Sequence, residues 1–271
     1  MSAADIPSLD AVLRRDRLVA ISGLSLVVVV SWIYVLTGAG MGMTAIEMTD
    51  MSMSDMARSA VMQPAAWNAG YAALMFFMWW LMMVAMMLPS ASPMVLLFAV
   101  VNRKQRDQGN PFVPTGVFAA GYLIAWGGFS AVATGLQWGF EQIGVLSSMM
   151  VSTSALFGGA MLVAAGAYQL TPLKHACLKH CRSPMQFVSR HWRPGSGGAL
   201  RMGLQHGSYC MACCWFLMGL LFVGGVMNLY WIAGLTLFVL LEKTIPVGHW
   251  LGSLTGVGLL LWGVWVLSAA G

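Results

Sequence analysis

The chain has 271 residues, of which 59% are hydrophobic and only 8% are charged, and its mean hydropathy is +0.76. A soluble domain with so few charged residues could not keep a polar surface, so the composition excludes that class and predicts a polytopic protein embedded in the lipid bilayer. The formal net charge of +5 comes from basic residues in short connections, where it sets orientation and gives no support for a nucleic-acid partner. The length allows several spans of about 20 residues but no separate soluble domain. We therefore expect one integral membrane domain over residues 1–271.

The first apolar run, 18–36, follows Arg14, Arg15 and Arg17, so it has to be distinguished from a signal peptide. Signal peptides have an apolar region of roughly 7 to 15 residues followed by a small-residue cleavage site. This run is longer and no convincing cleavage site follows it. We interpret it as a retained first span.

The apolar runs predict an all-α transmembrane bundle with about seven spans, with ends uncertain by several residues. The ranges are 18–37, 71–100, 114–136, 150–170, 208–227, 229–245 and 250–268. Alternate connections carry 13 and 1 of the Lys and Arg residues, and the richer side is expected to be cytoplasmic. The N-terminus is then cytoplasmic and the C-terminus external. Residues 38–70 form an external loop, and residues 171–207 form a cytoplasmic loop.

Methionines gather in two places. The external loop is rich in thioethers and acidic groups, namely Met41, Met43, Met48, Met51, Met53, Met56 and Met62 with Glu47, Asp50 and Asp55. In the second span, Met75, Met78, Met82 and Met86 fall within about 80° of one another on a helix. They form either a metal path or an adaptable packing surface, and the loop is either a metal-capturing segment or filler. Pro89 and Pro93 predict a kink toward the inner end of this span.

All five cysteines lie in one tract, with histidines among them. The residues are Cys177, Cys181, Cys210, Cys213 and Cys214, with His175, His180 and His206. A cytoplasmic location keeps thiols reduced, which favours ligation over disulfides. Cys177 and Cys181 are four residues apart, and His206, Cys210 and Cys213 follow at i, i+4 and i+7 along one helical stripe. Four thiolates, Cys177, Cys181, Cys210 and Cys213, could then meet and bind Cu(I) or Zn(II), or less favourably an iron–sulfur cluster.

Each of these residues also has a purely structural interpretation. Cysteines are often small buried hydrophobes, and for Cys214 alone that interpretation is preferred. Neighbouring positive charge from Lys174, Lys179 and Arg182 would favour thiolates at the first pair and hence ligation. His206 is interpreted as a ligand or a close neighbour of one, whereas His175 and His180 remain equally compatible with either role. Glu242 and Lys243 are expected to form an ion pair that anchors the end of the sixth span.

Three sequence motifs resemble a known family. They are Met82-Met83-x-Ala85-Met86-Met87-x-Pro89-Ser90, a tract from Tyr168 to Pro184 containing Thr171-Pro172-Leu173-Lys174-x-x-Cys177, and Gly203-x-x-x-Gly207-x-x-Cys210-x-x-Cys213-Cys214-Trp215. The chain from the second span to Lys243 resembles the uncharacterised bacterial family of predicted metal-binding integral membrane proteins. The resemblance implies a multi-pass protein of the bacterial inner (cytoplasmic) membrane with a metal site.

The favoured function is binding of a soft transition metal, copper above zinc, for metal transfer or metalloenzyme assembly, together with a metallochaperone or a membrane-complex partner. The chain has no Walker A or H-E-x-x-H sequence, which removes support for nucleotide-driven pumping and zincin proteolysis. One alternative is a membrane oxidoreductase with a thiolate-bound metal or a redox thiol pair. The other is a zinc-stabilised structural subunit of a membrane complex.

Overall fold

The computed structural model describes residues 9–53, 66–107, 113–147, 150–246 and 248–270. These residues form helices and contain no strand beyond one isolated bridge between Leu146 and Ser152, so the predicted all-α fold is confirmed. The helices are α1 (Leu9–Leu36), α2 (Ala45–Met53), α4 (Ala69–Asp107), α5 (Thr115–Gln142), α6 (Ala155–Gln169), α7 (Pro172–Arg182), α8 (Pro184–His191), α9 (Gly195–Gly219), α10 (Leu221–Gly224), α11 (Leu229–Thr244) and α12 (Gly248–Ala270).

Among the described residues, five helices are long and apolar enough to cross a membrane: Leu18–Leu36, Ala69–Gln105, Thr115–Gln142, Gly195–Gly224 and Trp250–Ala270. A sixth crossing arises if α6 and α7, which bend by 64° at their junction, count as one span. Predicted spans 150–170 and 229–245 correspond to α6 and α11, which have only 15 and 16 residues. At a rise of 1.5 Å per residue, each is shorter than a hydrocarbon core of about 30 Å.

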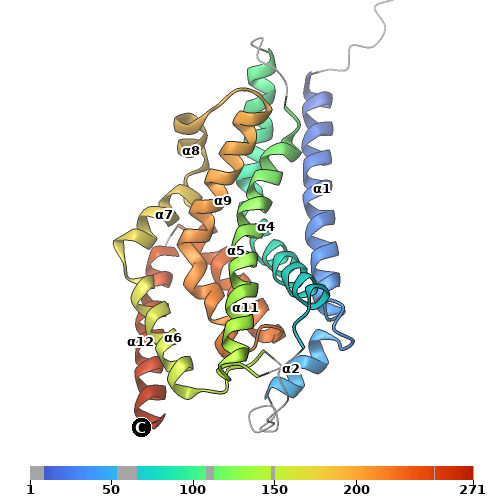
Figure 1. Cartoon of the computed structure of the whole chain (residues 1–271). Coiled ribbons are helices and arrows are strands. Elements are labelled where there is room, and N and C mark those ends of the chain that lie inside the picture. Colours follow the sequence, from blue (N-terminus) through green and yellow to red (C-terminus); the bar gives the residue numbers. More distant parts are fainter. Residues whose placement is uncertain (1–8, 54–65, 108–112, 148–149, 247, 271) are drawn as a thin grey trace, which may run out of the picture.

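Residues 171–207, which were predicted to form a cytoplasmic connection between spans, are largely helical in the structure. They form α7, α8 and the first half of α9. Proline marks the start of both short helices, at Pro172 and Pro184, and the side chain of Thr171 accepts a hydrogen bond from the Lys174 amide as the N-cap of α7. Figure 1 shows α7 alongside the middle of α9, with α8 nearer one end of the bundle.

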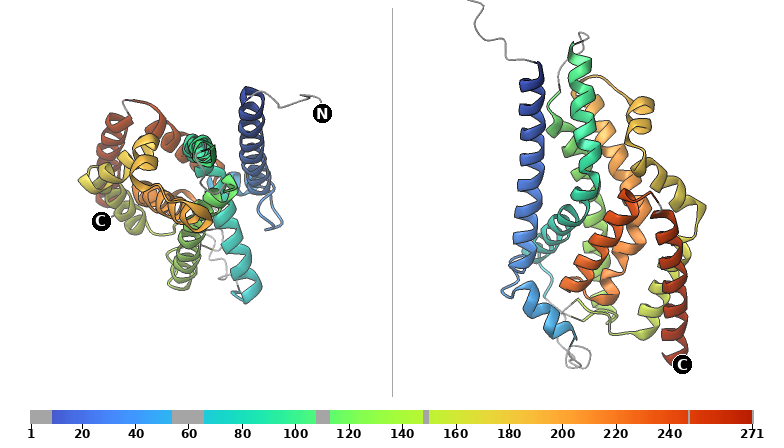
Figure 2. Two further views of the ribbon diagram at one scale, coloured as in Figure 1. Left: turned by 90° about the horizontal axis from the view of Figure 1, so that it is seen from above. Right: turned by 180° about the vertical axis from the view of Figure 1, so that it is seen from behind.

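Helix α4 changes direction along its length, as its two prolines predict. Its earlier part runs obliquely and its later part runs along the bundle (Figure 2). Pro93 cannot bond the carbonyl of Pro89, and the Ser92 hydroxyl donates to that oxygen instead at 2.7 Å. The Tyr122 hydroxyl and the Ser90 hydroxyl both donate to the Met87 carbonyl, at 3.2 and 2.9 Å. Around the bend, the carbonyl oxygens of Met87 and Pro89 are therefore hydrogen-bonded, and the Met87 side chain is buried.

Two helix pairs pack closely through glycine. A Cβ atom added at Gly166 of α6 would lie 2.7 Å from the Gly256 carbonyl oxygen of α12, and one at Gly263 would lie 2.9 Å from the Gly159 carbonyl oxygen. Gly121 of α5 likewise faces the backbone of Leu200 in α9. Small residues at these positions allow the helix backbones to approach each other closely.

At the end of the bundle where α1 finishes and α12 ends, a tight turn leads into α2 (Figure 1). Gly38, Ala39, Gly40 and Gly42 all have positive φ there, between 53° and 85°. This is the left-handed region that glycine enters without steric cost. The turn reverses the chain and lays α2 against the start of α11, where the Leu229 amide donates to the Thr49 hydroxyl at 2.8 Å.

Candidate metal centre

The candidate centre lies where α7 packs against α9. The Cys181 thiol, on α7, lies near the thiols of Cys210 and Cys213 on α9, close enough to interact with both. The sulfurs of Cys213 and Cys214 each lie 3.0 Å from the carbonyl oxygen of Cys210. All three α9 cysteines are buried. The positions of the α9 thiols relative to one another follow from helical spacing alone. The packing of α7 on α9 brings Cys181 to them.

The bend between α6 and α7 allows Cys181 to approach the thiols of α9. The chain turns by 64° at Leu170 and Thr171, so α7 leaves the axis of α6 and runs beside α9. Cys177 lies one helical turn before Cys181 and is close enough to Cys213 for their charges to interact. Of the four thiols predicted as ligands, the structure places Cys181, Cys210 and Cys213 near one another and Cys177 close to Cys213.

A methionine and a tyrosine complete the inner wall of the cluster. The Cys214 sulfur lies 3.9 Å from the Met87 sulfur, and the Tyr122 hydroxyl lies 3.1 Å from the Cys210 sulfur. Sequence reasoning placed Cys214 in the core and missed Met87. The signal for Met87 is its position next to Met86, directly before the kink at Pro89.

The charged neighbour of the thiols is Lys243, which corrects the expected pairing. Its ammonium nitrogen is 3.0 Å from the Cys210 sulfur. Glu242 pairs with Lys174 in a buried ion pair, and Lys174 also donates to Gln169. Consecutive residues of a helix point about 100° apart, so Glu242 and Lys243 face different neighbours.

The basic residues predicted to surround Cys177 and Cys181 contact other groups or solvent. Lys174 is taken by Glu242, and the guanidinium of Arg182 donates to the carbonyl oxygens of Ile245 and Pro246, at 2.7 and 2.5 Å. Lys179 is exposed. The positive charge that reaches the cluster therefore comes from the end of α11, on a separate part of the chain.

His206 is buried in an aromatic cage, and its Nδ1 has no hydrogen-bond partner among the described residues. Its ring lies 5.9 Å from that of Tyr122 and 5.3 Å from that of Phe187. A buried polar nitrogen without a partner is costly, and such a group suits a ligand or an ordered water. His206 thus lies next to Tyr122, whose hydroxyl contacts the Cys210 sulfur.

The other two predicted histidines lie farther out. His180 stacks on Tyr209 with ring centroids 4.2 Å apart and places its Nδ1 2.9 Å from the Ala176 carbonyl oxygen. His175 lines a surface pocket with Lys179 and Arg182. His175 is therefore not brought into the thiol cluster.

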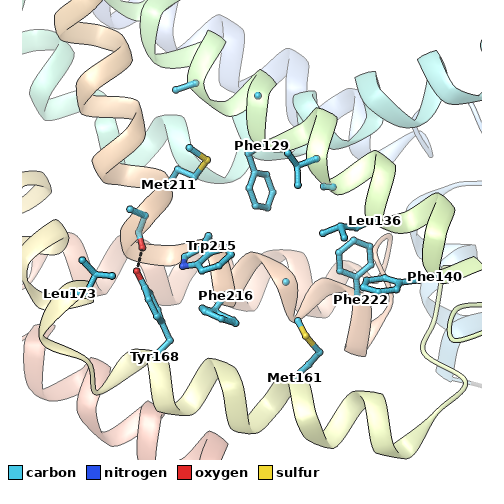
Figure 3. Close-up of a pocket in the computed structure, with 16 residues that line it drawn as sticks. Phe129, Leu136, Phe140, Met161, Tyr168, Leu173, Met211, Trp215, Phe216 and Phe222 are labelled. Atoms are coloured by element: carbon cyan, nitrogen blue, oxygen red, sulfur yellow. Dashed lines mark hydrogen bonds between the residues drawn. The ribbon is translucent and has the colours of Figure 1, made fainter.

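The opposite face of α9 lines an apolar pocket of about 670 Å³ between α5, α6 and α9 (Figure 3). Met211, Trp215 and Phe216 face this pocket from α9, and Met161 faces it from α6. The Tyr168 hydroxyl donates to the Ala212 carbonyl at 2.6 Å, between the pocket and the thiols. Helix α9 thus lies between the buried thiols and an apolar pocket lined by aromatic side chains.

Residues 76–266 match the PpoB2 family, which is described as copper chaperones. The chain belongs to the PpoB2 copper chaperone family. The match spans the thiol tract, the kinked α4 and the end of α11. No curated protein and no solved structure shows significant similarity to the chain.

Membership in the PpoB2 family supports a copper-related role and agrees with the metal-related family that the sequence resembles. Several long apolar helices are compatible with a multi-pass membrane protein. All five cysteines are free thiols, and no three His, Cys, Asp or Glu side chains of the described residues already enclose a metal position. The chemistry of the available donors, thiols with a thioether, fits Cu(I), which prefers soft sulfur ligands.

Proposed function

We propose that this chain binds Cu(I) as cargo at Cys181, Cys210 and Cys213 and passes it to an acceptor protein. The observation that carries the proposal is the packing of α7 on α9, which places the Cys181 thiol near the Cys210 and Cys213 thiols. Three soft donors from two elements can close on one ion with small side-chain movements. Cys177 and Cys214 are the adjacent thiols that can exchange with them as copper arrives or leaves.

Two neighbours favour copper over zinc as the cargo. The Met87 thioether is 3.9 Å from Cys214, and thioethers select Cu(I), whereas structural zinc sites use thiolate and imidazole. A Cu(I) ion held by two thiolates leaves a net negative charge. Lys243, 3.0 Å from Cys210, balances that charge inside the bundle.

The methionines of α4 supply a route to this centre in the proposal. Met75, Met78, Met82 and Met86 are fully buried, and Met87 continues the series to the thiols. Thioethers bind Cu(I) more weakly than thiolates, so an ion would move down the series toward the cysteines. We propose that the cysteines face the cytoplasmic side of the bacterial inner membrane, with a metallochaperone or a membrane-complex partner as acceptor.

The decisive experiment compares copper binding by the wild type and by the triple variant Cys181→Ser, Cys210→Ser, Cys213→Ser. Both are purified in detergent under reducing conditions and titrated with Cu(I) against a chromogenic chelator. We expect about one tightly bound copper per wild-type chain and its loss in the triple variant.

A matched control is Ser208→Ala, because Ser208 lies on the same helix as the α9 thiols but is exposed, and its hydroxyl donates to the Leu204 carbonyl of its own helix. This variant should bind copper like the wild type. Full retention of the tight copper by a folded triple variant would overturn the proposal.

A further inference from the structure

A second sulfur-lined cavity lies at the end of the bundle where α1 gives way to α2. It has a volume of about 330 Å³ and is lined by Met41, Met43, Met48 and Met150 together with Gly40, Tyr71 and Leu74. The four methionines come from three separate segments: the turn after α1, helix α2 and the turn before α6. The sequence predicted a Met-rich external loop but gave no reason to include Met150.

Met150 adopts a backbone conformation that a long side chain rarely takes. Its φ is +58°, and it is buried. Such a residue costs on the order of 1–3 kcal/mol and persists only when its surroundings fix it. Here the Met150 amide donates to the Ser147 carbonyl at 2.8 Å, and the Val226 amide donates to the Met150 carbonyl at 3.2 Å. The fold thus holds a strained methionine with its side chain in the cavity, where glycine would be easier to accommodate.

The other walls are also held firmly. Helix α2 begins with a capping box, in which the Thr44 amide donates to the Glu47 carboxylate at 2.7 Å and the Glu47 amide donates to the Thr44 hydroxyl at 3.3 Å. Thr49 then ties α2 to the first residue of α11. The cavity is therefore formed by fixed elements, and its thioethers are placed before any ligand arrives.

A buried carboxylate lies beside this cavity. Glu141 is 3% exposed, and its oxygens accept from the Trp67 indole at 2.7 Å and from the Gln137 amide at 3.0 Å. In the described part of the chain, no Lys, Arg or His side chain pairs with it. Tyr71, which lines the cavity, lies within electrostatic range of Glu141.

The same network reaches the methionine series of α4. The Gln137 amide nitrogen that contacts Glu141 also lies 3.4 Å from the Met75 sulfur, and the Gln137 oxygen accepts from the Trp79 indole at 2.8 Å. One glutamine thus connects the carboxylate to the first thioether of the buried series. A cation leaving the cavity would meet the Glu141 carboxyl group and then Met75.

We propose that Met41, Met43, Met48 and Met150 form an outer Cu(I) site, and that Glu141 balances the charge of the ion on its way to Met75. The inference rests on the proposed copper-carrying function and adds the site where copper is captured. Thioethers are neutral, so a bound Cu(I) keeps its positive charge, and a buried carboxylate without a cationic partner stabilises it.

The test uses Ag(I) as a soft monovalent probe and the full chain with all five cysteines replaced by serine, which removes every thiol of the inner site. Methionine methyl groups are labelled with ¹³C and followed by NMR during the titration. We expect shifts of the four cavity methyls. Met150→Leu and, separately, Glu141→Gln should weaken Ag(I) binding by about tenfold or more.

Two further variants keep the test independent of folding. Met150→Gly removes the thioether but relieves the positive φ, so it should fold normally and still lose Ag(I) binding. Met185→Leu, an exposed methionine on α8, should leave binding unchanged. Wild-type Ag(I) affinity in Met150→Gly, or unshifted cavity methyls, would overturn the outer site. If the outer site fails this test but the triple cysteine variant still loses its tightly bound copper, the inner site remains supported. Failure of the outer site can therefore be told apart from failure of the proposed function.

Discussion

The ammonium nitrogen of Lys243 lies 3.0 Å from the sulfur of Cys210, and both side chains are buried inside the bundle. Charges interact strongly in such an environment because little solvent screens them. The contact connects the last turn of α11 to the thiols of α9. The candidate centre therefore depends on an element more than thirty residues away in the sequence.

Replacing this cation tests its contribution to copper binding. In Lys243→Met, the negative charge of a thiolate-bound Cu(I) is no longer balanced, and we expect the Cu(I) affinity to fall by about 10- to 100-fold. Competition with a Cu(I) chelator measures the change. Lys179→Met removes an exposed lysine of α7 and should leave the affinity unaltered. Equal affinities for the two variants would show that Lys243 has no electrostatic role at the centre.

The sequence was sufficient for the long apolar helices and for the α9 half of the centre. Apolar runs predicted the long helices, and the i, i+4, i+7 spacing of His206, Cys210 and Cys213 predicted their shared face because both depend only on local geometry. The Thr171-Pro172 and Ser183-Pro184 pairs were available start signals for α7 and α8. Their polar composition instead suggested a loop.

The remainder of the centre depends on tertiary packing that spacing does not encode. Contact between Cys181 and α9 requires the 64° bend after α6. Lys243 was assigned to Glu242 because the two are adjacent, yet Glu242 contacts Lys174, which is 68 positions away. Met150 could not be placed beside Met48 without knowing how the turn before α6 packs on α2.

The buried ion pair between Lys174 and Glu242 should matter for stability. Both side chains are 1% exposed. Removing one partner leaves an uncompensated buried charge, so Lys174→Met should destabilise the folded chain by about 3–5 kcal/mol. The double variant Lys174→Met, Glu242→Met should recover much of that loss because no charge remains. Thermal unfolding in detergent measures all three proteins. A single variant as stable as the wild type would show that the pair contributes nothing.

Acid should weaken the start of α2 through Glu47. The backbone amide and hydroxyl of Thr44 hydrogen-bond to this carboxylate and lower its pKa below the usual glutamate value. Because the folded pKa is depressed, the contribution is fully present above the unfolded pKa and is lost as pH falls through the folded value. NMR titration of ¹³C-carboxyl glutamate should show a resonance with a low pKa that disappears in Glu47→Gln. A Glu47 resonance that titrates at the usual value would contradict the capping box.

The close packing of α6 on α12 should tolerate no side chain at Gly166. A Cβ there would lie 2.7 Å from both the Gly256 carbonyl oxygen and the Leu260 amide nitrogen, which are backbone atoms that cannot move alone. We expect Gly166→Ala to destabilise the chain by about 1–3 kcal/mol through overpacking. A larger residue such as leucine should separate the helices and prevent folding.

Gly258 of α12 provides the matched control, because an added Cβ there meets no atom within 4 Å. Gly258→Ala should be neutral or slightly stabilising, since alanine has the higher helix propensity. Unfolding midpoints in the same detergent compare the two variants. Since α7 continues from α6, loosening α6 also releases Cys181 from α9, and Gly166→Ala should bind copper more weakly as well as unfold earlier. Equal midpoints for Gly166→Ala and Gly258→Ala would refute the close contact between α6 and α12.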